Sequence, residues 1–398
     1  MANLNFINTL RSLRRLDWSM VAAMLALLGI GIAFIFSAGY GNPNSPAKPL
    51  FLKQLCWAAL GILFFIGFAI SDYHRWIRLA WWIYAAGAIL LVLVFVPHMG
   101  LKIYGARRWL QLAGFRILQP AELMKLAVII LLARLFGWPG RNLRHWRLTL
   151  FSLALVLIPM ALIIKQPDLG TALVFMPVLA GVMWISGVSA TRLAALAALG
   201  ILLAGGVLAL VMIPPKLGMD ELSHERLMRR IGISSYQRER IAVFLDRNRD
   251  PLGAGWNKAQ SQIAVGSGRL TGKGYLQGTQ NLLGFLPRTV APNDFIFAVI
   301  AEEKGFIGGV VMLVLFGVLL AAGLRAAESA ADKMGRLLCV GIVTMLFCHI
   351  FVNIAMTIGL LPVTGIPLPL ISYGGTFMIG TMTALGIVQS VYIRGEWR

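Results

Sequence analysis

The sequence predicts an all-α integral membrane protein with about ten transmembrane helices. Of its 398 residues, 58% are hydrophobic and only 13% are charged. The mean hydropathy is +0.78. A soluble domain of this size could not bury so much apolar surface, whereas a bilayer covers it. Residues 1–17 are polar and basic, and no cleavage pattern follows the first apolar run, so we expect no cleaved signal peptide.

Ten apolar segments approach or exceed the length of about 20 residues that a helix needs to cross the hydrocarbon core. They are 18–37, 51–70, 76–96, 120–138, 148–164, 169–186, 193–213, 295–324, 336–360 and 370–393. The fifth and sixth are short and only four residues apart, so they could instead form one broken pair of half-spans. We expect a single domain over 1–398, with a large extracytoplasmic loop at about 214–294, between the seventh and eighth helices.

The charge distribution predicts the orientation. With the N-terminus inside, the inner segments hold fifteen Arg and Lys residues and the short outer segments hold seven, which favours both termini in the cytoplasm. The formal charge of +20 lies in the loops between apolar segments. Anionic membrane lipids therefore explain the charge, and no nucleic-acid partner is expected. The three cysteines and five histidines have no metal-binding spacing, so no metal site is predicted.

One short outer loop is more basic than expected from the preference of Arg and Lys for the cytoplasmic side of a membrane. Residues 102–110 contain Lys102, Arg107 and Arg108. Excess positive charge on the outer face indicates contact with something anionic, either a bound substrate or ordinary lipid head groups.

Ionisable residues inside apolar segments are candidates for function, because burying a charge in a bilayer is costly. Glu122 and Lys125 are spaced to share one helical face, either as functional groups or as a self-neutralising pair that holds two helices together. Asp168 follows a proline and could be functional or simply cap the sixth span. Glu302 and Glu303 are adjacent, so at least one of them must face protein or a water-filled cavity.

The stretch 253–304 is the longest polar run that lies between two apolar segments. It is rich in Gly, Ser, Gln and Asn, and its glycines permit close backbone approach and positive φ. It leads into Asp294 at the start of the eighth span. Asp294 could be an N-cap of that span, or its carboxylate could accept a proton from a hydroxyl nucleophile at the membrane surface.

Several segments together resemble the SEDS family (shape, elongation, division and sporulation), closest to its RodA branch. The resemblance covers nearly the whole chain in the right order. The matching segments are GARRW at 105–109 with QPAELMK at 119–125, KQPDLGT at 165–171, DPLGAG at 250–255 with QSQIAVGSG at 260–268, GKG at 272–274 with GTQ at 278–280, DFIFAVIAEE at 294–303, Asn353, GLLPVTGIPLP at 359–369 and SYGG at 372–375.

This resemblance implies a peptidoglycan glycosyltransferase of the bacterial cytoplasmic membrane that acts during cell-wall elongation. Such an enzyme transfers the glycan chain of one lipid II-linked donor to the 4-hydroxyl of an acceptor lipid II and releases undecaprenyl pyrophosphate. The implied partners are a class B penicillin-binding protein, which supplies the transpeptidase, and other elongation-complex proteins. No cofactor is required, although Mg²⁺ or Mn²⁺ could assist the leaving group. The alternatives are a lipid II flippase and a non-catalytic scaffold for the transpeptidase.

The resemblance also implies roles for individual residues. Asp294 matches the family's essential acid and would be the general base. Glu122 would hold Lys125, and Asp168 would order the wall of the substrate cavity. The cations expected to meet the pyrophosphate are Arg107, Arg108, Lys125, Lys53 and Lys273. The predicted substrate-binding set is completed by three residues of the matched segments, Trp109, Gln262 and Gln280.

The match departs from the family just before Asp294. Relatives usually have Glu after Leu-Pro, followed by a short loop. Here Arg288 takes the place of that Glu, and the loop is about two residues longer. Any role that the family gives to the missing acid therefore cannot be carried over to this chain.

Overall fold

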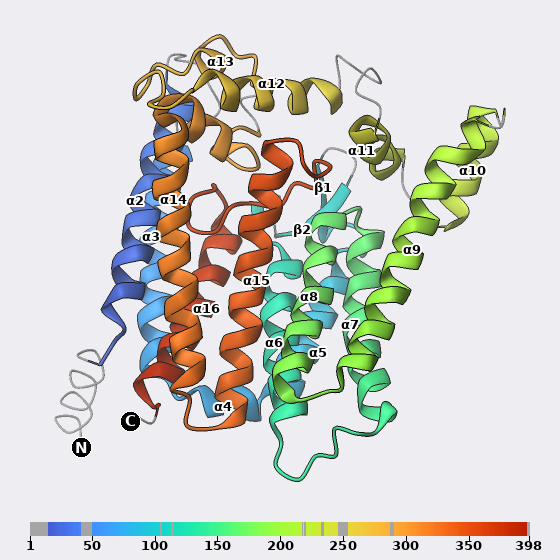
Figure 1. Ribbon diagram of the computed structural model, residues 1–398, viewed down its shortest axis with the longest axis vertical. Coiled ribbons are helices and arrows are strands. Elements are labelled where there is room, and N and C mark those ends of the chain that lie inside the picture. Colours follow the sequence, from blue (N-terminus) through green and yellow to red (C-terminus); the bar gives the residue numbers. More distant parts are fainter. Residues whose placement is uncertain are drawn as a thin grey trace.

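The apolar segments fold into helices that stand side by side in one bundle (Figure 1). The computed structural model describes residues 15–40, 50–103, 106–112, 115–216, 218, 220–231, 235–245, 254–286 and 290–395. Within these ranges, one helix lies in each of the ten predicted segments. They are α2 (Trp18–Gly39), α3 (Leu50–Ile70), α5 (Ala80–Leu93), α6 (Pro120–Gly137), α7 (Trp146–Lys165), α8 (Leu169–Ser186), α9 (Ala190–Lys216), α14 (Ile296–Glu328), α15 (Lys333–Thr357) and α16 (Gly375–Ile393).

Most of these helices have the length and composition of membrane spans. Eight of the described helices are long and apolar enough to cross a bilayer. Both α7 and α8 are among them, and their lengths favour two spans over the alternative of two half-spans. Of the remaining two, α5 is shorter, with 14 residues, and α6 carries Glu122, Lys125 and Arg134. The chain is thus a multi-pass membrane protein, and ten crossings remains a prediction.

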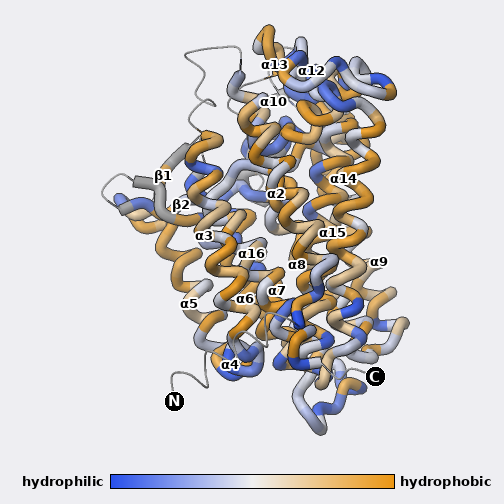
Figure 2. Tube along the Cα trace, turned by 90° about the vertical axis from the view of Figure 1, so that its left-hand side faces the viewer, coloured by the Kyte–Doolittle hydropathy of each residue, from blue (hydrophilic) through white to orange (hydrophobic). Residues whose placement is uncertain are grey.

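Burial differs from helix to helix according to position in the bundle. Along α6 all but two residues are buried, which explains how this helix can hold charged groups inside the bundle. By contrast, α9 lies at the edge of the bundle, and only 6% of its apolar stretch is buried. Figure 2 shows hydrophobic residues along the middle of the bundle and hydrophilic residues gathered towards its two ends. This is the pattern expected when lipid surrounds the helices.

The described residues between α9 and α14 form four helices towards one end of the bundle (Figure 1). They are α10 (Glu221–Ile231), α11 (Ser235–Leu245), α12 (Ala254–Ser267) and α13 (Thr279–Leu282). We call this the α12 end. The opposite end carries α4 (Tyr73–Arg78) and is called the α4 end.

The all-α prediction needs one correction, at the basic loop near the α12 end. A three-stranded antiparallel sheet forms from β1 (Gly100–Ile103), β2 (Ala106–Leu112) and β3 (Phe115–Leu118). In this sheet Arg107 pairs with Lys102 in register. The strands give Arg107 and Arg108 a fixed backbone, and since neighbours on a strand point to opposite faces, the two side chains diverge.

Helix α14 is interrupted at Gly305, where φ is +63°. The polar stretch before it supplies the missing backbone partners. Lys273 N–H and Gly274 N–H donate to the carbonyls of Glu302 and Glu303, both at 3.0 Å. Beyond the interruption, Phe306 N–H and Ile307 N–H donate to the carbonyls of Arg269 and Leu270. A break in a membrane helix is tolerated when its backbone groups are satisfied in this way.

The two adjacent acids of α14 fasten the polar stretch to the bundle. Glu302 Oε1 accepts hydrogen bonds from Lys273 Nζ at 2.6 Å and from Gln280 N–H at 3.0 Å. Glu303 accepts from Leu276 N–H at 3.1 Å and from the hydroxyl of Ser37, at the end of α2. Both acids are buried. The prediction that at least one of them faces protein is confirmed for both.

At the α4 end, hydrogen bonds tie the beginning of the described chain to its end. Asp17 caps α2 by accepting from the N–H groups of Ser19 and Met20. Its own N–H donates to Gln389 Oε1 at 3.0 Å, and Arg325 Nη2 lies 2.8 Å from its carboxylate. These contacts bring the start of α2 and the end of α16 to the same end of the bundle.

A charged cluster at the α4 end predicts a pH-dependent contribution to stability. His74 Nδ1 lies 2.8 Å from Asp72 and Nε2 lies 2.9 Å from Asp332. Burial alone would lower the pKa of His74. The hydrogen bonds and charges of the two carboxylates outweigh it and raise the pKa above the ordinary 6.5. The protonated ring therefore stabilises the folded state fully below pH 6.5, and this contribution is lost as pH rises through the raised pKa.

We expect the melting temperature of the purified protein to fall as the pH rises from 6 to 8, by a modest amount because His74 is half exposed. His74→Gln should remove this part of the slope. His145→Gln alters an exposed histidine at the same end and should leave the slope unchanged. Equal slopes for the wild type and His74→Gln, measured by thermal unfolding in detergent, would contradict the prediction.

Candidate active site

Asp294 lies in the turn that leads into α14, and its backbone is held from two sides. Its N–H donates to the carbonyl of Val290 at 2.9 Å, and its carbonyl accepts from Asn353 Nδ2 at 2.9 Å. Asn353 is fully buried in α15 and also donates to the carbonyl of Ile366 at 2.7 Å. One amide thus fixes the turn before α14 against the segment that precedes α16.

The alternative that Asp294 caps α14 is wrong. The residue at the N-cap is Phe295, and no side chain makes a capping hydrogen bond there. The carboxylate of Asp294 is therefore not consumed by the helix that it precedes. The residue as a whole is partly buried rather than fully enclosed.

Two arginines and one acid set the electrostatics of Asp294. Burial raises the pKa of its carboxyl above the ordinary value, the charges of Arg240 and Arg108 partly offset this, and Asp168 adds to it. Arg240 belongs to α11, and its Nη1 donates to the carbonyl of Val363 at 2.8 Å. A carboxylate with a raised pKa is a better proton acceptor than an ordinary Asp.

Arg108 and Asp168 order the connection between α7 and α8. Arg108 Nε donates to the carbonyl of Gln166 at 3.3 Å, and its Nη2 donates to the carbonyl of Pro167. Asp168 caps α8, as one of the two alternatives predicted, by accepting from Thr171 N–H at 3.3 Å. Its second oxygen accepts from Gln119 Nε2 at 3.1 Å. Asp168 therefore links the start of α6 to the start of α8 as well as capping α8.

Glu122 and Lys125 form the predicted pair on α6. Lys125 Nζ lies 2.8 Å from Glu122 Oε2, and both side chains are buried. The same nitrogen donates to His349 Nε2 at 2.8 Å and lies 5.6 Å from the ring centroid of Phe377. The pair thus joins α6 to α15 and α16, as expected for groups that hold helices together.

The remaining predicted residues lie in different surroundings. Lys273 is in the ion pair with Glu302, and Gln280 is bonded to the same acid through its backbone. Gln262 donates to the carbonyl of Ile358 at 3.2 Å, next to the end of α15. Trp109 is partly buried on β2, whereas Lys53 and Arg107 are exposed. The structure thus groups Arg108 and Asp168 with Asp294. Lys273 and Gln280 belong instead to the contacts that hold the polar stretch to Glu302 of α14.

Three residues of this region are not among the site residues predicted from the sequence. Arg240 and Gln119 lie in the group around Asp294, and His349 contacts Lys125. Gln119 and His349 had detectable signals, since Gln119 begins a matched segment and His349 is an ionisable group inside a span. Arg240 is one of several arginines in a charged stretch, and nothing local distinguishes it. Arg288, where the chain departs from its family, lies outside the described residues.

Metal binding receives no structural support within the described part of the chain. No group of three or more His, Cys, Asp or Glu side chains there is arranged to hold a metal ion. Within the site, the carboxylate of Glu122 is paired with Lys125, and that of Asp168 accepts from the amide of Gln119.

Gly365 provides a test of how closely the site is packed. Its φ is +77°, and a Cβ at this position would lie 3.3 Å from Asp294 Oδ2 and 3.4 Å from Arg240 Nη1. We expect Gly365→Ala to cost about 1–2 kcal/mol of backbone strain. By displacing Asp294 it should also lower the rate of the reaction by up to about 100-fold.

The matched control is Gly187→Ala. Gly187 also has a positive φ, +95°, but no atom lies within 4 Å of its added Cβ. The control should share the loss of thermal stability and keep full activity. If both variants were equally active, close packing at Gly365 would be irrelevant to the reaction.

Comparison with known proteins identifies the family. The family model FTSW_RODA_SPOVE, described as cell cycle protein, matches residues 18–395. The chain belongs to the FtsW/RodA/SpoVE family. It is 32% identical to the peptidoglycan glycosyltransferase RodA of Treponema pallidum over 97% of this chain and 99% of that protein. It is 37% identical to the peptidoglycan glycosyltransferase MrdB of Escherichia coli K12 over 95% of this chain and 93% of that protein.

A solved structure agrees with the fold. A chain from a peptidoglycan synthase complex, solved to explain how polymerisation and crosslinking are coordinated, superposes with a TM-score of 0.71. The two sequences are 32% identical, and the match covers 95% of this chain and 97% of that chain. The family membership predicted from the sequence segments is therefore confirmed along nearly the whole chain.

Proposed function

We propose that this protein is a peptidoglycan glycosyltransferase that polymerises lipid II during cell-wall elongation. The observation that carries the proposal is the carboxylate of Asp294, which has a raised pKa, caps no helix and lies in the field of Arg108 and Arg240. Relatives that carry the name peptidoglycan glycosyltransferase match more than nine-tenths of the chain.

The proposed reaction joins two lipid-linked sugars. The 4-hydroxyl oxygen of the acceptor attacks the anomeric carbon of the donor glycan, and the bond from that carbon to the pyrophosphate oxygen breaks. Asp294 accepts the hydroxyl proton as general base. The products are a glycan chain longer by one lipid II unit and undecaprenyl pyrophosphate.

The leaving pyrophosphate gains negative charge as the bond breaks, and fixed cations nearby would stabilise it. Arg108 and Lys125 are our principal candidates, with Arg107 and Lys53 as exposed cations nearer the surface. Arg240 joins this set because its charge acts on Asp294. Lys273 is paired with Glu302 at 2.6 Å, so we assign it to holding the polar stretch rather than to the pyrophosphate. Trp109, Gln262 and Gln280 remain candidates for contacts with the sugars or peptide.

We further propose that the chain forms one domain in the bacterial cytoplasmic membrane, with both termini in the cytoplasm and the segment 214–294 outside. The α12 end then faces the wall, where the product is needed. The proposed partner is a class B penicillin-binding protein within an elongation complex, supported by the related synthase complex that coordinates polymerisation and crosslinking. The reaction needs no resident cofactor. Mg²⁺ or Mn²⁺ would act, if at all, on the pyrophosphate.

The test is polymerisation of lipid II by the purified full-length protein, with and without its class B partner, in the presence of moenomycin. That antibiotic targets a different glycosyltransferase fold, so resistant glycan would come from this chain. Adding EDTA to the same assay measures the metal requirement. If no glycan formed even with the partner, the hypothesis of a non-catalytic scaffold for the transpeptidase would be favoured. Lipid II movement across proteoliposomes without polymerisation would favour the flippase.

A further inference from the structure

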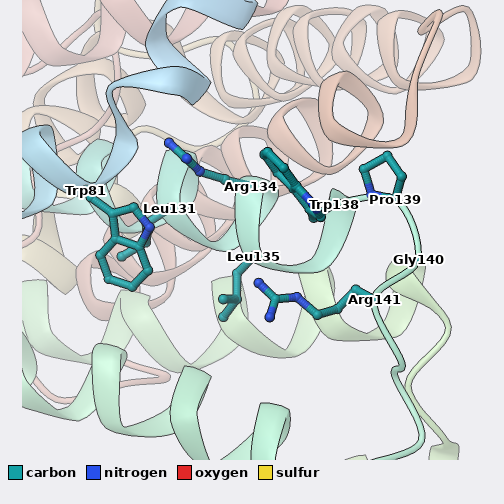
Figure 3. A pocket seen from close by; sticks show the side chains of 8 residues that line it. All are labelled: Trp81, Leu131, Arg134, Leu135, Trp138, Pro139, Gly140 and Arg141. Carbon is teal, nitrogen blue, oxygen red and sulfur yellow. The ribbon is translucent and has the colours of Figure 1, made fainter.

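A pocket of about 380 Å³ opens at the α4 end, away from Asp294. It lies at the end of α6, beside the start of α5 and the loop that leads to α7. Figure 3 shows Trp81 on one side and Pro139 and Gly140 on the other, with the Arg141 side chain running from its loop back towards Leu135. Pockets of this volume are large enough for a small ligand or a lipid head group.

Two arginines line the pocket. Arg134 Nη1 donates to the carbonyls of Ile77 at 3.0 Å and Arg78 at 2.5 Å, so its guanidinium is held in place. It also lies 5.6 Å from the ring centroid of Trp138. Arg141 is exposed, and among the described residues no acid pairs with its side chain. One fixed and one adaptable guanidinium suit a phosphate group.

The segments that flank the pocket are positively charged, like the two arginines that line it. Residues 71–82 and 134–147, which flank the pocket, contain six arginines and a single acid, Asp72. That acid is engaged by His74 at 2.8 Å. The field at the pocket is therefore positive, and the complementary ligand is an anion.

The exposed aromatic rings in and beside the pocket suit an acyl chain. Trp81, Trp138 and Phe151 of α7 are 41%, 52% and 47% exposed. The rings of Trp81 and Phe151 lie 6.2 Å apart and join α5 to α7 beside the pocket. Exposed tryptophans next to arginines are typical of the boundary between the head groups and the hydrocarbon core.

We propose that this pocket binds the head group of an anionic phospholipid from the leaflet at the α4 end, the cytoplasmic leaflet in our orientation. The phosphate lies between Arg134 and Arg141, and an acyl chain runs along the exposed rings of α5 and α7. The bound lipid steadies the end of α6, the helix that carries the Glu122–Lys125 pair further along its length. This site is independent of the proposed polymerase reaction.

The experiment compares lipid retention by native mass spectrometry. The full-length protein is equilibrated in mixed micelles of phosphatidylglycerol and phosphatidylcholine. We expect the wild type to retain phosphatidylglycerol preferentially. Arg141→Gln should lower the retained ratio by about fivefold, the amount expected for one arginine near an anionic surface. Arg147→Gln removes the same charge from an exposed position on α7 that does not line the pocket, so it should lower the ratio much less than Arg141→Gln does.

A second measurement guards against misfolding. At the same concentration, added phosphatidylglycerol should raise the melting temperature of the wild type and of Arg147→Gln by more than that of Arg141→Gln. The lipid-free melting temperature of Arg141→Gln should equal that of the wild type. Equal losses in both variants would mean diffuse surface attraction and would overturn the site. Displacement of the lipid by soluble glycerol phosphate would overturn the assignment to a membrane lipid.

Discussion

Asp294→Asn is expected to abolish polymerisation of lipid II while leaving the protein folded in the membrane. Asparagine has the shape of aspartate but cannot accept the hydroxyl proton, and loss of a general base costs about 10²–10⁴ in rate. The fold should survive because the hydrogen bonds that residue 294 makes to Val290 and Asn353 use backbone atoms. The measurement is glycan formed per unit time by purified protein together with its class B partner.

Asp220→Asn is the matched control. Asp220 is an exposed acid before α10 that accepts a hydrogen bond from Ser223 N–H at 3.0 Å, and asparagine caps helices as well as aspartate does. This variant should polymerise at the wild-type rate. If Asp294→Asn also kept that rate, another group would have to be the base.

The pH profile separates a base from a merely structural acid. Burial raises the pKa of Asp294 above the ordinary 3.8, against the opposing charges of Arg240 and Arg108. A general base works only when it is deprotonated. The rate should therefore be full above this raised pKa and fall as the pH drops through it. The residual activity of Asp294→Asn should lack this acid limb.

The sequence predicts the positions of the long helices well, because a bilayer requires long apolar segments and this is a local requirement. The segment 169–186 coincides with α8, and most other boundaries agree within a few residues. The interruption of α14 at Gly305 is not predictable in this way. It depends on backbone hydrogen bonds to residues 269–274, and these partners cannot be identified from the segment 295–324 alone. The sheet at 100–118 was missed because its strands are short and basic rather than alternating and apolar.

The site residues likewise fall into those that sequence motifs predict and those that only tertiary packing brings together. Asp294, Arg108 and Asp168 could be nominated because they fall in matched segments, and the structure brings their charges together. The surroundings of Lys273 could not be predicted, since its partner Glu302 lies 29 residues away in sequence. Arg240 reaches Asp294 only because α11 packs near the segment before α16, where Arg240 bonds to Val363. Such partners follow from tertiary packing, which one sequence does not reveal.

Lys125→Met is expected to produce the largest loss of stability among the substitutions considered. Lys125 and Glu122 are 3% and 5% exposed and lie 2.8 Å apart. Removing the ammonium leaves the carboxylate of Glu122 buried without its counter-charge, which typically costs about 3–5 kcal/mol. The measurement is the fraction of protein that remains monodisperse after heating in detergent.

The double variant Glu122→Gln/Lys125→Met distinguishes a structural pair from a catalytic one. It removes both charges together, and replacing a whole buried ion pair is often close to neutral. We therefore expect its thermal stability to return towards that of the wild type. Polymerisation should stay lost, because no cation would then remain at position 125 to meet the leaving pyrophosphate. If the stable double variant polymerised lipid II at the wild-type rate, the pair would serve only to join α6 to α15 and α16, and Arg108 and Arg240 would be left as the cations that stabilise the leaving group.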